Sequence, residues 1–175
     1  AASDVEEFTE AVWTSVGDTV YGTAATPGKP FGPPTVAVTG TVTVGAVTTP
    51  TASAGPNHWD TPENWTLNAV PVSTNDVDLI DCAVDILWGL DQTGVTLASL
   101  NIYSTFTGKL GLPVLNTLGY EEYRPRHLTL GATTISIGIG LGSGSSRLNI
   151  NTLAVQTTLS VASTGSPAAQ GAPVV

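Results

Sequence analysis

The chain has 175 residues, enough for one sizeable hydrophobic core or for one core with a small appendage. Its 14 acidic residues outnumber five lysines and arginines, and the formal net charge of -9 argues against binding to a phosphate backbone. The single cysteine, Cys82, excludes an internal disulfide framework, and no apolar run reaches the length of about 18 residues that a membrane-spanning helix needs.

The first part of the chain has the composition of short strands. Apolar residues alternate with Thr and Ser in AVWTSVGDTVYGTA and again in TVAVTGTVTVGAV, which is the period of a half-buried strand. The proline-rich TPGKPFGPP between them is a loop or an extended edge. We expect residues 1–48 to form a small β unit that is marginal by itself, followed by a Thr/Pro/Ser/Gly-rich linker at 49–56.

A weak repeat of 20 residues follows in the second part. Residues 128–147 and 148–167 align with apolar matches such as Leu128 with Leu148 and Leu141 with Val161, and helical periodicity is absent. Such a repeat predicts coils that stack on one another. The expected fold is all-β: a right-handed parallel β-solenoid of short coils over 57–167, with an N-terminal cap and an insertion at 113–127. An extended tail at 168–175 follows. A Thr/Ser/Gly-rich β-sandwich is the alternative.

Residues 59–80 follow the pattern W-x(4)-N-W-x(5)-P-x(4)-D-x-D-x-I. The segment resembles the start of secreted bacterial β-solenoids of the autotransporter and adhesin type and, more closely, phage- and prophage-encoded β-rich structural proteins. The resemblance covers about residues 57–165 and implies architecture, not chemistry. Two indoles are a compact cover for an open end of a core, although tryptophans that stack on sugar rings are the alternative. The predicted cap residues are Trp59, Asn64, Trp65, Pro71 and Asp76.

Aspartates form the densest group of carboxylates, at positions 76, 78, 81, 85 and 91. Paired carboxylates can bind a hard cation or act as an acid and a base. The spacing of a calcium loop is absent, so we expect solvated aspartates at strand ends and turns, and no metal site.

The insertion carries YEEYRPRH, the only place where aromatic, acidic, basic and imidazole groups crowd together. The candidate binding residues are Tyr120, Tyr123, Arg124, Arg126 and His127. In a polysaccharide-cleaving protein an arginine there stabilises charge and a histidine or carboxylate acts as the base. The alternative, which we favour, is a surface loop that docks on a neighbouring segment or subunit, because Tyr and Arg are enriched at protein interfaces.

Motifs for nucleophilic, zinc or phosphate chemistry are missing from the sequence, so we expect neither an enzyme nor a cofactor. The predicted function is a non-catalytic structural or adhesive protein of an assembly, most closely a phage virion component of capsid-associated, decoration or fibre type. The alternatives are a secreted bacterial adhesin and a polysaccharide-binding or polysaccharide-cleaving β-helix. Expected partners are subunits of the same or a neighbouring assembly, a second copy in a homo-oligomer, or a surface glycan. The expected location is a virion or the cell surface.

Overall fold

The structure, a computed structural model, describes residues 9–32, 52–117, 119–153 and 155–162. The chain divides into two compact units, Ala1–Ala54 and Gly55–Val175. The division falls inside the stretch where the sequence predicts a linker. The strand run predicted at 35–47 and the tail predicted at 168–175 lie outside the described residues.

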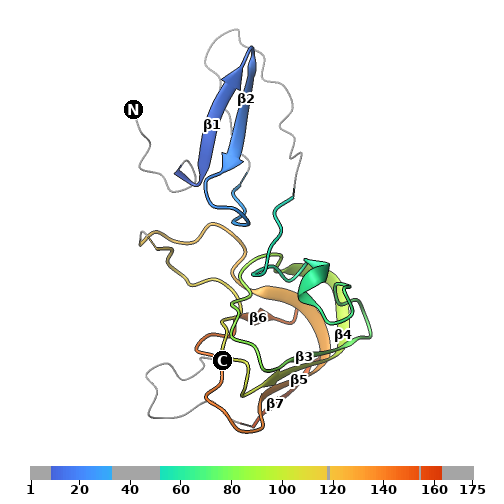
Figure 1. Cartoon of the computed structure of the whole chain (residues 1–175). Helices are drawn as coiled ribbons and strands as arrows, with labels where there is room; N and C mark the ends of the chain where they lie inside the picture. Colours follow the sequence, from blue (N-terminus) through green and yellow to red (C-terminus); the bar gives the residue numbers. More distant parts are fainter. Residues whose placement is uncertain (1–8, 33–51, 118, 154, 163–175) are drawn as a thin grey trace. The chain divides into compact units, whose positions relative to one another are not determined.

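The first unit contains an antiparallel hairpin of β1 (Ala11–Val16) and β2 (Thr19–Ala24), shown in Figure 1. The two strands are joined by a tight turn in which Gly17 has a φ of 58°, a left-handed conformation that glycine adopts at little cost. The indole of Trp13 lies over Gly22 on the opposite strand, where an added Cβ would meet the ring at 2.8 Å. The absence of a side chain at position 22 therefore makes room for the tryptophan.

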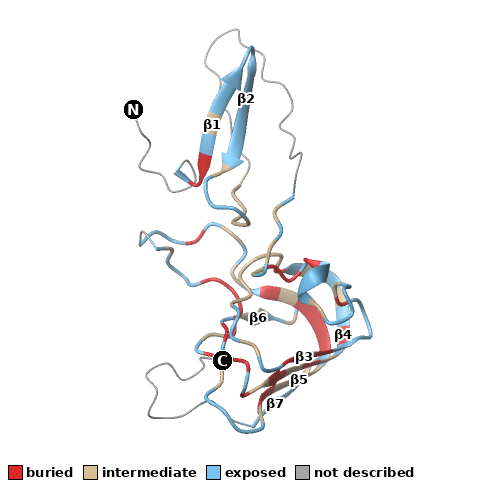
Figure 2. Ribbon diagram, in the orientation of Figure 1, coloured by how far each residue is buried: buried red, intermediate tan, exposed pale blue. Residues whose placement is uncertain are grey.

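Most of the hairpin faces solvent, as the pale blue strands of Figure 2 show. Val16 and Val20 are 70% and 67% exposed. An ion pair of 2.6 Å between Lys29 and Glu10 lies at the base of the hairpin. A two-stranded ribbon buries too little apolar surface to be stable alone.

The second unit is built on one five-stranded parallel sheet. The strand order is β3-β4-β5-β6. Strand β7 also pairs with β5, at Thr134 to Ile137, beyond the residues of β5 that pair with β6. Figure 1 shows β4 and β5 as long curved strands. A single turn of 3-10 helix, η1 (Pro62–Asn64), precedes the sheet. The strands are β3 (Asp76–Leu79), β4 (Asp91–Tyr103), β5 (Leu128–Ile139), β6 (Ile150–Asn151) and β7 (Thr158–Val161).

Four strands of this sheet align in unbroken rows of side chains. Successive side chains of a strand point to opposite faces, so polar and apolar rows alternate. The inward rows are Val77, Leu100, Ile135, Leu159 and Leu79, Ile102, Ile137, Val161. The outward rows are Asp76, Ser99, Thr134, Thr158 and Asp78, Asn101, Ser136, Ser160. The alternation seen in the sequence therefore marks the two faces of one sheet.

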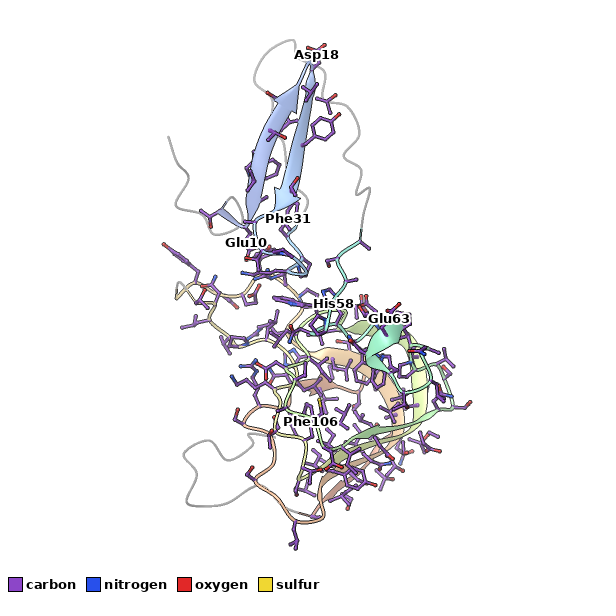
Figure 3. All side chains as sticks on the ribbon, in the orientation of Figure 1. Glu10, Asp18, Phe31, His58, Glu63 and Phe106 are labelled. Carbon is purple, nitrogen blue, oxygen red and sulfur yellow. The ribbon has the colours of Figure 1, made fainter. Side chains whose placement is uncertain are left out.

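The hydrophobic core lies between the inward rows and the segments that connect the strands. Phe106 and Leu110 come from the connection between β4 and β5, and both are fully buried. Figure 3 labels Phe106 inside the curve of the sheet. Isolated parallel bridges, Ile86 to Leu110 and Leu110 to Leu148, align these connecting segments with each other. The side of the core opposite the sheet is therefore covered by extended connecting segments.

The predicted β-solenoid of 20-residue coils is wrong. The structure is strand-rich, but its strands form a two-stranded antiparallel sheet and a five-stranded parallel sheet. Asp76 pairs with Ser99, Ser99 with Thr134 and Thr134 with Thr158, and these partners are 23, 35 and 24 positions apart. Leu128 pairs with Ile150 and not with Leu148. Connections of unequal length separate the described strands of this sheet, so these strands share no common repeat.

Candidate functional site

In the tryptophan segment before β3, side-chain donors bond to backbone carbonyls of the same segment. The Asn64 side-chain amide donates to the carbonyls of Gly55, at 2.9 Å, and His58, at 2.7 Å. The Trp65 indole N–H donates to the carbonyl of Trp59 at 2.8 Å, and the two rings meet edge to face with centroids 4.7 Å apart. Trp59 is 1% exposed and belongs to the core. One asparagine and one indole thus hold the loop closed.

The same segment docks on the connection between β3 and β4. The Trp59 amide donates to the Trp88 carbonyl at 2.9 Å, and His58 forms a parallel bridge with Trp88. Gly89 has a φ of 65°, and a Cβ there would lie 2.1 Å from the Asp60 carboxylate. Glycine is therefore required where the segment crosses. Of the other predicted cap residues, Pro71 is buried and Asp76 opens β3.

Arg124 is the centre of a compact polar and aromatic cluster, here called the arginine cluster and formed by Trp88, Glu122, Tyr123 and Arg124. Its guanidinium makes a bidentate pair with Glu122, with Nε to Oε1 at 2.7 Å and Nη2 to Oε2 at 2.9 Å. It also lies 4.8 Å from the ring centroids of both Trp88 and Tyr123. The side chains of Arg124 and Glu122 are only 9% and 3% exposed. Arg124 is therefore held by a carboxylate and two aromatic faces.

The base of the insertion is fixed by donors from the chain after β5. Arg147 donates from Nε and Nη2 to the carbonyl of Gly111, at 3.0 and 2.7 Å, and the Asn149 amide donates to that of Leu112 at 2.7 Å. Burial lowers the pKa of the Arg147 guanidinium from its ordinary value, and the Asp85 carboxylate opposes part of that shift. Gly111 has a φ of 87°, and a Cβ there would lie 2.4 Å from the Arg126 carbonyl. These hydrogen bonds and the conformation of Gly111 thus fix the backbone where the insertion begins.

The rest of the predicted binding set is more open. Leu115 and Glu121 form an antiparallel bridge, and the Tyr120 amide donates to the Asn116 side chain at 2.9 Å, so this part of the insertion is a short hairpin. Tyr120 is 57% exposed. Arg126 and His127 contribute backbone carbonyls, which accept from the Leu112 amide at 3.0 Å and the Thr129 hydroxyl at 3.3 Å.

Of the five candidate binding residues, the structure brings Tyr123 and Arg124 together. The sequence-based selection missed Trp88 and Glu122. Glu122 is adjacent to the selected residues and carries the charge that an arginine requires. No sequence pattern indicated Trp88, because it is distant from the insertion in the chain and lies in an apolar run typical of a buried strand.

The aspartates are distributed along the sheet and its turns. Asp76 accepts from the Ser99 hydroxyl at 2.6 Å, and Asp78 from the Asn101 amide at 2.8 Å, both on the outward face. Asp85 accepts from the Lys109 amide at 2.8 Å, and Asp91 from the amide of Thr93 at 3.2 Å. Within the described ranges no group of three or more His, Cys, Asp or Glu side chains is arranged to hold a metal ion.

Comparisons with protein-family models, with curated proteins and with solved structures gave no match. In the part of the chain that the structure describes, no helix is long and apolar enough to cross a membrane.

Proposed function

We propose that the protein is a non-catalytic structural protein that acts through contacts with other protein subunits of an assembly. The observation that carries the proposal is edge strand β7. Leu159 and Val161 continue the inward rows of the sheet, yet they are 53% and 40% exposed. Apolar side chains at an open sheet edge favour pairing with a further strand.

The arginine cluster supports the same proposal. A charge stabiliser for a polysaccharide needs a guanidinium whose N–H donors are aimed at the substrate. The Arg124 guanidinium instead lies over the rings of Trp88 and Tyr123, and two of its N–H groups donate to Glu122. This arrangement holds the base of the insertion in a fixed shape and leaves the exposed Tyr120 to make contacts outside the chain.

The assembly that we propose first is a phage virion, because residues 57–165 resemble phage-encoded structural proteins; a bacterial cell surface comes second. Mass spectrometry of purified particles and of cell-surface fractions from the source organism tests this. We expect the chain in a fixed copy number relative to other particle or surface subunits. A chain found only free in the soluble fraction contradicts the proposal.

A glycan array separates this function from glycan recognition. We expect no binding by the wild-type chain. Binding that is lost when Arg124, Arg126 and His127 are all replaced by alanine, in a variant that still folds, would instead assign the insertion to a sugar.

A further inference from the structure

We propose that copies of this chain associate head to tail, with β7 of one copy pairing in parallel with β3 of the next. The inference rests on the proposed function, since it names a second copy of the chain as a neighbouring subunit. Among the described strands, β3 pairs only with β4 and β7 only with β5, so each is an edge of the sheet.

The two edges match in length, direction and pattern. Each strand has four residues, D-V-D-L in β3 and T-L-S-V in β7, and both run parallel to the strands between them. A β3 strand placed beside β7 continues all four rows of the sheet. Polar residues meet polar residues, and apolar residues meet apolar residues, without any shift of register.

The inward rows gain burial from this pairing. Within the chain the row through Leu100 is closed at one end, where Val77 is 4% exposed, and open at the other, where Leu159 is 53% exposed. Pairing places the β3 strand of the next copy, with its Val77, beside Leu159, and its Leu79 beside Val161. The hydrophobic effect therefore favours covering the open end.

The outward rows supply donors to acceptors. Asp76 already accepts from Ser99 through Oδ1, and a carboxylate has further lone pairs on its two oxygens. On the other side of β3 the pairing brings the Thr158 hydroxyl to Asp76 and the Ser160 hydroxyl to Asp78. These contacts repeat, between copies, the hydroxyl-to-carboxylate bond that Ser99 and Asp76 make within one chain.

The charges select this arrangement over a two-fold one. Pairing β3 with β3 brings four carboxylates together on a chain of net charge -9, which is unfavourable. Pairing β7 with β7 leaves the hydroxyls without carboxylate acceptors. A contact between two different edges is heterologous and does not close after two copies. Four paired residues make a small contact, so we expect weak association that becomes populated at the high local concentration of an assembly.

Crosslinking tests the pairing directly. In a Cys82→Ser background, Asp76→Cys and Thr158→Cys are placed on separately tagged full-length chains and treated with a bismaleimide that spans less than about 10 Å, two strand spacings. Each chain then carries a single cysteine, so every adduct joins two chains. We expect adducts that carry both tags. Adducts from either variant alone, or none at all, overturn the inference.

Sedimentation velocity tests the energetics. We expect the wild-type chain to form a concentration-dependent series of oligomers, and Leu159→Lys to raise the apparent dissociation constant about tenfold or more. Val16→Lys is the control, because Val16 is 70% exposed and lies in β1, outside the sheet of the second unit; it should leave association unchanged. A wild-type chain that stays monomeric at its highest soluble concentration, a closed dimer, or equal effects of the two lysines each overturn the inference.

The outcomes also separate the inference from the proposed function. A chain present in particles or at the surface that gives no β3 to β7 adduct leaves the proposed function standing and assigns the edge to another protein or another segment of the chain. A chain that forms the adduct but is absent from particles and surfaces contradicts the proposed function alone.

Discussion

Replacement of Leu100 by alanine tests which leucines form the core of the second unit. Leu100 is fully buried at the middle of an inward row, between Val77 and Ile135 on the neighbouring strands. Its removal leaves a cavity that close packing on both sides cannot fill, and buried Leu→Ala changes cost about 2–5 kcal/mol. We expect a value in the upper half of this range, because the central strand β4 is held in place on both edges.

Leu141 is the matched control. It is 95% exposed, so Leu141→Ala should change the free energy of unfolding by less than about 0.5 kcal/mol. Urea unfolding followed by tryptophan fluorescence gives both values, and a Trp13→Phe background restricts the signal to Trp59, Trp65 and Trp88 of the second unit. Equal losses for the two variants would refute the reasoning, because they would mean that Leu141 faces the interior as the 20-residue alignment predicted.

Three further predictions concern the loops. Asn64→Asp removes the amide donor to the carbonyls of Gly55 and His58 and should lower the free energy of unfolding in urea by about 1–3 kcal/mol. Asn151→Asp, the control, adds the same charge but keeps the side-chain oxygen that accepts from the Leu153 amide, so it should be nearly neutral. Equal effects of the two variants would refute the role of the Asn64 amide. Gly111→Ala and Gly140→Ala both place a Cβ on a residue whose φ is near 80°, but only the Cβ at position 111 meets backbone, at the Arg126 carbonyl. The melting temperature of Gly111→Ala should therefore be lower than that of Gly140→Ala. The opposite order contradicts the geometry. Arg124→Ala removes the guanidinium from the buried Glu122 carboxylate and should cost about 3–5 kcal/mol, whereas Tyr120→Ala should cost less than about 1 kcal/mol. A neutral Arg124→Ala would show that the arginine cluster does not stabilise the fold.

The candidate site was only partly predictable. YEEYRPRH identified the insertion, because such a density of charged and aromatic residues is unusual in this chain, and Tyr123 and Arg124 do contact each other. The other aromatic partner, Trp88, lies 36 positions away from Arg124. Its approach depends on how the connection between β3 and β4 lies beside the end of the insertion, which no local pattern encodes.

The sequence by itself indicated strands with one polar and one apolar face, because alternation with a period of two follows from the geometry of a single strand. It also marked the segment of two tryptophans that packs on the core. It did not indicate that β4 and β5 are long, with 13 and 12 residues. The tertiary structure decided the register. Alternation places Leu100 and Leu159 on an inward face, but the residue opposite each of them depends on the lengths of the connections and on packing across the sheet. For the same reason only the fold shows that the row begins buried at Val77 and ends exposed at Leu159.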